Sequence, residues 1–286
     1  MKDLYTVTEV APKVYNISEN ITSRPIKFSQ QLVVGSERAV LIDASFGIDG
    51  DLVTEIRKIT DKPIFLLLTH GDPDHTGGAS LFDEVYMSPA DDALMKSAFN
   101  PAFRLHAIDV ASGHNAELVA HMTNDEPQAK SFDYKPVTDG MTFDLGGITL
   151  EAVATPGHSM GSMTFVDVAN HYAFSGDGLA TMVMSELYET RCASLTVWAE
   201  SLRKLQDVLA GDDSKIFSGH RLDAFPAGTL RALIDAVDDI KSGKTSDDQP
   251  ITNMPNGNVS DNDQMHPRTH KIANSPMVVM YNALNI

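Results

Sequence analysis

Four potential metal ligands fall within six residues of this 286-residue sequence. They are two histidines and two aspartates, at His70, Asp72, Asp74 and His75. A uniformly apolar run at 64–68 comes just before them and predicts a strand that is buried on both faces. Gly71 and Pro73 cannot continue that strand, so the ligands would gather on a loop at its end. Ligands held in this way by a rigid strand are typical of a preorganised metal site.

Three more candidate ligands stand at the ends of predicted strands, at His158, Asp177 and His220. Each of them follows a glycine, which lets another segment approach the backbone closely. One histidine at a strand end is more often structural than a ligand. The repetition of the pattern at successive strand ends favours a metal site assembled from all of them.

Hydrophobic periodicity indicates the elements that position these ligands. Short β-branched or alternating segments predict strands at 14–17, 31–34, 39–43, 85–87 and 216–218, with four more β-like segments between 141 and 177. Apolar residues at helical spacing predict helices at 49–59, 89–98, 195–209 and 229–240. A last strand at 277–281 is predicted to return to the sheet.

This order of elements predicts two β-rich halves sandwiched between helices, within a single domain over 1–286. Residues 99–136 show no clear sheet pattern and predict a helical insertion over the site. Residues 241–263 are rich in Gly, Ser, Asp, Asn and Pro, which predicts a polar surface excursion.

The composition disfavours several classes of function. Acidic residues outnumber basic ones by 39 to 22, so a nucleic-acid backbone or an anionic membrane surface would be repelled. The expected partner is a small-molecule substrate, with no nucleic acid and no membrane, and a homodimer is left open. No secretory signal pattern opens the sequence, so a cytoplasmic location is expected. The single cysteine, Cys192, excludes an internal disulfide and a cysteine-cluster metal site.

The motifs together resemble the metallo-β-lactamase superfamily, whose signature is HxHxDH after a strand, followed by a histidine, a bridging aspartate and a final histidine. Here the corresponding text is HGDPDH at 70–75, then His158, Asp177 and His220. The resemblance covers about 14–220, and TPGHSMGS at 155–162 looks like the glyoxalase II and lactonase branch of hydrolases. It implies an α/β fold, an αββα sandwich of two mixed β-sheets flanked by helices, with the site at one edge between the sheets.

The resemblance also implies a dinuclear site with two divalent metal ions, zinc being the expected metal. The first metal would take His70, Asp72 and His158. The second would take Asp74, His75 and His220, and Asp177 would bridge the two ions.

Position 72 departs from the family pattern, because it holds an aspartate where the pattern has a histidine. With Asp72, Asp74, Asp177 and one hydroxide, a cluster of two divalent ions would be formally neutral rather than positive. Carboxylates favour harder ions, which makes iron or manganese the alternatives to zinc. Aspartate is also shorter than histidine, so a second hypothesis is that Asp72 leaves the first site empty or loosely held.

The implied function is that of a metal-dependent hydrolase, in which a metal-bound hydroxide cleaves an ester, thioester, lactone or related bond of a small molecule. Asp74 is the predicted catalytic residue, since it would bind metal and accept a hydrogen bond from the hydroxide. Thr69 and Ser218 are candidates for holding the ligating rings.

Two alternatives to a hydrolase remain at this point. Flavodiiron proteins share the fold and carry a glutamate at the position of Asp72, which raises the alternative of a non-haem diiron oxidoreductase. A third hypothesis is a binding protein whose altered ligand has cost it catalysis.

Overall fold

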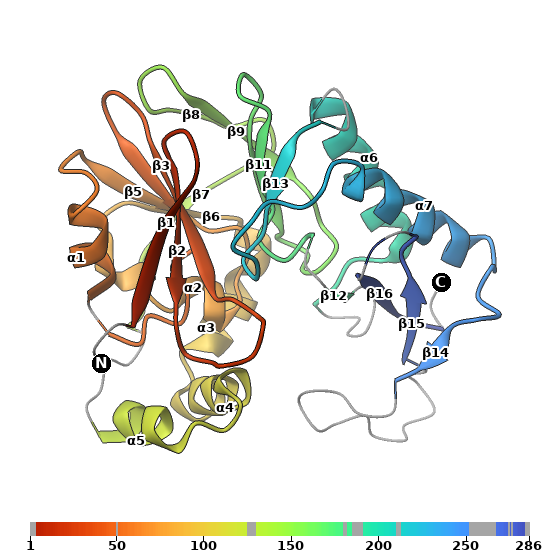
Figure 1. The fold of residues 1–286 in the computed structure, drawn as a ribbon, viewed down its shortest axis with the longest axis horizontal. Coiled ribbons are helices and arrows are strands. Elements are labelled where there is room, and N and C mark those ends of the chain that lie inside the picture. The colour runs from red at the N-terminus through yellow and green to blue at the C-terminus, as the bar shows by residue number, and fades with distance from the viewer. Residues whose placement is uncertain are drawn as a thin grey trace.

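The computed structural model describes residues 4–49, 51–124, 130–179, 182–184, 191–209, 213–251, 267–273, 275 and 277–283. Within these residues the strands form three sheets, and helices cover the outer faces of the two larger ones (Figure 1).

The first sheet contains seven strands in sequence order. They are β1 (Tyr5–Ala11), β2 (Val14–Glu19), β3 (Ser29–Val34), β4 (Ala39–Ile42), β5 (Ile64–Leu67), β6 (Val85–Met87) and β7 (Lys135–Pro136). The pairs from β1 to β4 are antiparallel and those from β4 to β7 are parallel, so the sheet is mixed. The sequence patterns had not indicated β1 or β7.

The second sheet has five strands in the order β13-β11-β10-β9-β8. They are β8 (Thr142–Asp144), β9 (Thr149–Ala154), β10 (Met163–Asp167), β11 (Tyr172–Phe174) and β13 (Lys215–Phe217). All neighbours are antiparallel except β11 and β13, which are parallel, so this sheet is also mixed.

Side chains that alternate along the strands hold the two sheets face to face. On β5, Phe65 and Leu67 join an apolar cluster that also contains Phe165 and Phe174 of the second sheet. Leu66, between them on β5, belongs to a different cluster on the opposite face. This alternation is expected of a strand whose two faces are both covered. The predicted αββα sandwich is confirmed.

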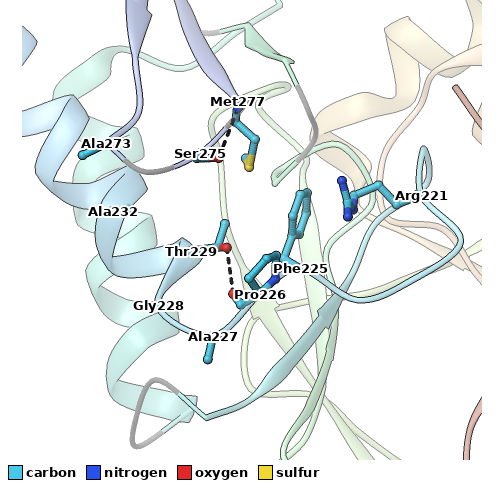
Figure 2. Close-up of a pocket in the computed structure, with 10 residues that line it drawn as sticks. All are labelled: Arg221, Phe225, Pro226, Ala227, Gly228, Thr229, Ala232, Ala273, Ser275 and Met277. Carbon is cyan, nitrogen blue, oxygen red and sulfur yellow. Dashed lines mark hydrogen bonds between the residues drawn. The ribbon is translucent and has the colours of Figure 1, made fainter. Parts of the chain in front are cut away.

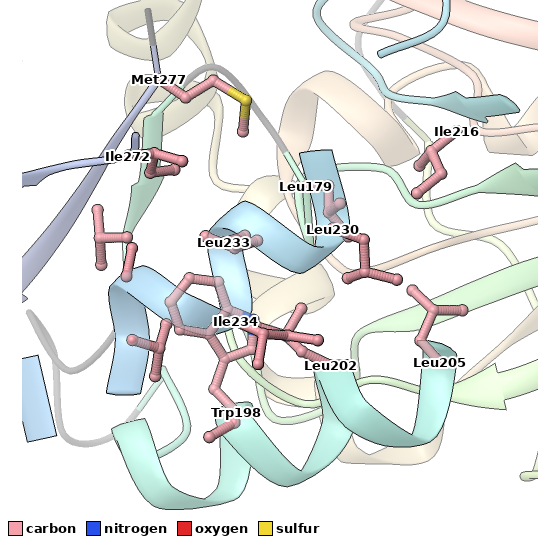
Figure 3. Close-up of a cluster of buried hydrophobic side chains, with 14 of the residues drawn as sticks. Leu179, Trp198, Leu202, Leu205, Ile216, Leu230, Leu233, Ile234, Ile272 and Met277 are labelled. Carbon is pink, nitrogen blue, oxygen red and sulfur yellow. The ribbon is translucent and has the colours of Figure 1, made fainter. Parts of the chain in front are cut away.

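Helices complete the sandwich on both sides. On the first sheet, α1 (Asp51–Arg57) and α3 (Asp92–Ala98) contribute Leu52, Ile56 and Met95 to the outer cluster. On the second sheet, α6 (Leu195–Leu209) and α7 (Thr229–Lys241) lie together, and their apolar stripes enclose Trp198 and Leu233 (Figure 3). Both pairs of helices were predicted from apolar residues recurring every three or four positions.

The prediction for the last strand, at 277–281, was wrong about its partners. β16 (Val278–Asn282) joins a third sheet of four strands rather than either layer of the sandwich. The other three strands are β12 (Met182–Met184), β14 (Gln249–Pro250) and β15 (Pro267–Lys271). The strand has this position because Val279 and Tyr281 are buried in the same cluster as the apolar faces of α6 and α7.

The predicted helical insertion at 99–136 contains two helices in its described part, α4 (Pro101–Ser112) and α5 (Ala116–Asn124), before β7. Asn100 caps α4 by accepting hydrogen bonds from two backbone N–H groups, and Gly113 ends it in the left-handed conformation. Most of the predicted excursion at 241–263 lies outside the described residues, and β14 falls in the rest. The division into a single domain stays a prediction.

The shorter helices are α2 (Pro73–Thr76) and two 3-10 turns, η1 (Ala79–Leu81) and η2 (Pro89–Asp91). The predicted helix at 89–98 is therefore divided into η2 and α3. In the part of the chain that the structure describes, every helix is too short or too polar to cross a membrane.

Candidate metal centre

All seven predicted ligands lie at the ends of strands, and the structure brings them together. β5 leads to His70 and Asp72, and α2 then carries Asp74 and His75 on its single turn. The other three follow β9, β11 and β13, at His158, Asp177 and His220. Three overlapping groups of these residues have ligand atoms within 4.8 Å of one another. Their convergence is a geometric fact, and their binding of metal stays a prediction.

Four of the ligands form what we call the second cluster, namely Asp74, His75, Asp177 and His220. Their facing atoms lie at similar separations: His75 Nε2 is 3.7 Å from Asp74 Oδ2 and 3.3 Å from Asp177 Oδ1. His220 Nε2 is 3.5 Å from Asp74 Oδ2 and 3.1 Å from Asp177 Oδ2. Donor atoms around a tetrahedral zinc ion with bonds of about 2.1 Å are about 3.4 Å apart. Asp74, His75 and His220 therefore have the spacing of donors around a metal ion, and Asp177 lies beside the two rings through different oxygens.

Two atoms of the second cluster are buried without a hydrogen-bond partner among the described residues. They are His75 Nε2 and Asp177 Oδ1, which face each other. Such orphaned polar atoms are costly unless something else satisfies them. A divalent cation between them would do so, and this observation supports the fit of a metal to the second cluster.

The imidazole rings of the second cluster are fixed from outside. Asp43 Oδ2 lies 2.8 Å from His75 Nδ1, and the backbone oxygen of Lys27 lies 2.8 Å from His220 Nδ1. With Nδ1–H donating outward, each Nε2 presents its lone pair to the centre, as is common for metal-binding histidines. The Phe28 ring stands edge-on to His220 at 5.3 Å and packs with Ile108 of α4 in one cluster.

Asp43 connects this support to His70 through Thr69. The Thr69 hydroxyl donates to Asp43 and lies 3.0 Å from His70 Nδ1, so it accepts from that ring. The prediction that Thr69 holds a ligating ring is confirmed. Ser218 instead accepts a hydrogen bond from the backbone N–H of His220, so its predicted contact with a ring was wrong.

Electrostatics in the second cluster follow from its charges. Burial disfavours protonated His220, but Asp177 and Asp74 outweigh that effect and raise its pKa to about 9. Burial would raise the pKa of Asp177, yet His220 and His75 hold it well below its usual range. Without a cation, the carboxylates of this cluster draw protons onto its histidines.

The remaining ligands, His70, Asp72 and His158, form what we call the first cluster. Asp72 Oδ2 lies 3.1 Å from His70 Nε2 and 2.9 Å from His158 Nε2. A residue absent from the sequence prediction joins them: Arg191 Nη2 is in close contact with Asp72 Oδ2 and lies 2.8 Å from His158 Nε2. Burial would raise the pKa of Asp72, but Arg191 and the two rings hold it well below its usual range.

A buried carboxylate that was also not predicted, Asp91, ties the two ligand loops of the first cluster together. It accepts hydrogen bonds from the backbone N–H groups of Gly71 and Gly161, at 3.0 and 2.7 Å. The Ser159 hydroxyl donates to it at 2.6 Å. Asp91 therefore fixes the segment after β5 against the segment around His158.

Close packing explains why glycine precedes the last three ligands. A Cβ at Gly219 would lie 2.5 Å from the ring of His75, and one at Gly176 would lie 2.1 Å from the Thr69 hydroxyl. A Cβ at Gly157 would lie 2.2 Å from the ring of Trp198. All three separations are too short for any side chain, so the close approach predicted from these glycines is confirmed.

Comparison with known proteins identifies the family. The sequence profile of the metallo-beta-lactamase superfamily matches residues 30–220, which is more than half of the chain. The chain belongs to the metallo-β-lactamase superfamily. A metallo-beta-lactamase from Pontibacter korlensis superposes with a TM-score of 0.58 at 20% identity, covering 82% of this chain and 99% of that one. At that identity the superposition shows the shared fold.

Two fungal proteins are similar to this chain in sequence. The lactamase-like protein notP of Aspergillus sp. (strain MF297-2) is 29% identical over 72% of this chain and 55% of its own length. An atrochrysone carboxyl ACP thioesterase of Pseudocercospora fijiensis is 26% identical over 68% of this chain and 51% of its own length. The chain thus spans about half the length of these relatives.

Arg221, the residue that follows His220 in the sequence, lines a cavity of about 290 Å³ (Figure 2). Phe225, Pro226 and Met277 give it an apolar wall, and the Arg221 guanidinium lies 4.9 Å from the centre of the Phe225 ring. None of the seven predicted ligands lines this cavity, so it is separate from the metal centre expected of the superfamily.

Proposed function

We propose that the chain is a metal-dependent hydrolase that cleaves an ester, thioester, lactone or related bond of a small molecule. The observation that carries the proposal is the second cluster, in which Asp74, His75 and His220 have ligand atoms within 4.8 Å of one another and two buried atoms, His75 Nε2 and Asp177 Oδ1, have no hydrogen-bond partner among the described residues. The superfamily and the thioesterase name of one relative support hydrolysis, and they make thioesters the first substrates to test.

The residues of the second cluster would have separate roles. His75, His220 and Asp177 would hold a divalent ion, and Asp43 and the Lys27 carbonyl would keep the two rings turned inward. When bound there, such an ion supplies Lewis-acid chemistry, activating water and polarising the bond to be cleaved.

Asp74 is the residue we propose to handle the proton. Its side chain is 18% exposed, more than any other of the seven predicted ligands. A carboxylate at the solvent side of the cluster meets incoming water first. It would orient that water by accepting a hydrogen bond, and then take its proton as the new bond forms.

The diiron alternative receives no such support at position 72. A second iron would need Asp72 as a free ligand, whereas Asp72 Oδ2 accepts a hydrogen bond from Arg191. The hydrolase proposal uses only the second cluster, whose donors form no ion pair with an arginine or lysine among the described residues.

The test is a hydrolysis screen on protein stripped with a chelator and then reloaded with Zn²⁺, Mn²⁺ or Fe²⁺ separately. We expect cleavage of an acyl-coenzyme A thioester, a nitrophenyl ester or a lactone, abolished by the chelator and restored by an ion. Asp74→Asn should lower kcat by at least about 100-fold. Asp207→Asn, at an exposed position of α6, is the matched control and should leave kcat unchanged. Chelator-resistant cleavage, or no cleavage with any ion, would overturn the proposal.

A further inference from the structure

We propose that the Arg191 side chain takes the place of the first metal, so that the chain binds one divalent ion, at the second cluster. This inference rests on the proposed function and specifies its metal centre. It replaces the dinuclear site that the family resemblance implies.

The contacts of Arg191 use the atoms that a first metal would need. Its Nη2 donates to both Asp72 Oδ2 and His158 Nε2. A neutral imidazole nitrogen has one lone pair, and at His158 Nε2 that lone pair accepts the guanidinium proton. His158 therefore cannot bind a metal through the same atom while Arg191 is in place. Without His158, the first cluster would offer a metal only His70 and the carboxylate of Asp72, whose charge Arg191 already balances.

Backbone hydrogen bonds fix Arg191 beside the first cluster. The N–H of Met160 donates to the carbonyl of Arg191 at 2.9 Å, and the N–H of Ala193 donates to the carbonyl of Gly157 at 2.9 Å. These two bonds flank His158 and join its loop to the segment that carries the arginine. These main-chain hydrogen bonds hold the backbone of Arg191 beside the first cluster, so the position of the guanidinium does not depend on the flexible side chain alone.

Charge and size explain why an aspartate stands at position 72. A histidine there would be neutral and would leave an always-protonated guanidinium without a counter-ion. Asp72 gives Arg191 an opposite charge in a site where the two side chains are 9% and 25% exposed. A divalent ion added to the first cluster would face that fixed positive charge at close range. The aspartate that departs from the family pattern is the partner of the arginine.

The second cluster provides an internal comparison. Among the described residues, its four donors form no ion pair with an arginine or lysine, although the charges of Asp74 and Arg191 act on each other at longer range, and two of its buried atoms have no hydrogen-bond partner. The first cluster satisfies Asp72 Oδ2 and His158 Nε2 from within the protein. In the described part of the chain, His158 Nδ1 and Arg191 Nε are also buried without a hydrogen-bond partner, so the clusters differ in one respect: only in the first does an arginine contact the atoms that would face a metal.

The experiment measures metal content directly. The full chain is stripped, loaded with excess Zn²⁺, desalted, and analysed by elemental analysis and native mass spectrometry; a parallel titration follows the visible absorption of Co²⁺. We expect one ion per natural chain and a Co²⁺ end point at one equivalent. Arg191→Met combined with Asp72→His restores the family's histidine and removes the arginine, so it should bind two ions. Arg203→Met, at an arginine of α6 paired with Asp238, is the matched control and should stay at one.

Single substitutions keep the test decisive if the double variant does not fold. His158→Ala should still bind one ion, whereas His220→Ala should bind none. Two ions on the natural chain, or a single ion lost with His158→Ala, would overturn the inference and leave the proposed function standing. A folded double variant that binds only one ion would also overturn it. No ion on the natural chain would overturn the inference and the metal-dependent function together.

Discussion

The first and second clusters use the same kinds of side chain and arise from the same strand ends, yet the structure completes them differently. In the first, Arg191 supplies a positive charge to Asp72, and His158 Nε2 accepts one of its protons. In the second, the two atoms that face each other, His75 Nε2 and Asp177 Oδ1, are buried without a partner in the described part of the chain; His158 Nδ1 and Arg191 Nε of the first cluster are also buried without one. On our proposal, only the second cluster binds a metal, because in the first a cation of the protein already occupies the atoms that would face one.

The largest expected effect comes from removing a donor of the second cluster. Asp177→Ala deletes the carboxylate that lies 3.3 Å from His75 and 3.1 Å from His220. Even the groups that support metal ligands alter affinity by about 10- to 100-fold, so loss of a ligand should weaken Zn²⁺ binding by more than about 100-fold. Competition with a fluorescent chelator measures this. Unchanged affinity would show that the second cluster is not the metal site.

The matching change in the first cluster should affect stability instead. Asp72→Ala leaves the Arg191 guanidinium without its counter-ion in a mostly buried position, which we expect to cost about 2–4 kcal/mol of the free energy of unfolding. Adding Arg191→Met should recover most of that loss, because the unpaired charge is then gone. Urea unfolding of the metal-free single and double variants completes the cycle. Additive losses in the double variant would contradict the pairing.

Substituting a residue that holds the predicted ligands from outside should have a smaller effect, and the effect should differ between the two clusters. Asp43→Asn weakens the group that holds His75 Nδ1 and the Thr69 hydroxyl, so Zn²⁺ affinity should fall by about 10- to 100-fold. Asp91→Asn is the control in the first cluster, since Asp91 binds the loops of Gly71 and Gly161. It should lower stability by about 1–3 kcal/mol without changing Zn²⁺ affinity. Equal effects of the two variants on affinity would remove the distinction.

The smallest effect is expected at the exposed ion pair of Glu84 and Lys135. Its contribution to stability is a reference for that of the buried pair of Asp72 and Arg191. Hydrogen bonds from Lys135 are the chief cause that lowers the pKa of Glu84 to about 2, with Tyr86 and Arg38 adding to it. A carboxyl whose folded pKa lies below its unfolded value stabilises the fold above the unfolded value. That stability is lost as the pH falls from about 4.5 toward 2. Glu84→Gln should cost less than about 1 kcal/mol at pH 7, and this cost should shrink as the pH falls toward 2, as measured by acid-dependent urea unfolding.

The sequence predicted the parts of the site that depend on strand ends. A buried strand such as β5 is recognisable from its composition, and the residues directly after such a strand must lie at the sheet edge. The convergence of His70 with His158 and His220 was therefore foreseeable. The short polar strands β14 and β15 were not, because two to five residues carry too little pattern. β16 has a clear β pattern, but its partner strand β12 lies far away in sequence.

The supporting charges were missed for a different reason. Asp43 and Asp91 are ordinary acidic residues in the sequence, and only their burial, at 1% and 2% exposure, reveals a structural role. Arg191 lies outside any regular element, shortly before α6, where no periodicity indicates which way a side chain points. The only sequence signal for Arg191 was the aspartate at position 72. An unexpected negative charge indicates a positive partner, but the sequence does not show which residue that partner is.

The pairing of β12 with β16 has a consequence for the nascent chain. Residue 182 lies beside residue 278 in the third sheet, so β12 lacks its described partner strand until β16 has been synthesised. Every donor of the second cluster, in contrast, has left the ribosome once His220 and the residues just beyond it emerge. Chains are synthesised at about 5–20 residues per second, so the residues of the second cluster are available seconds before β16. We therefore expect the nascent protein to be able to capture its ion before the third sheet closes, which would make the metal a participant in the order of folding.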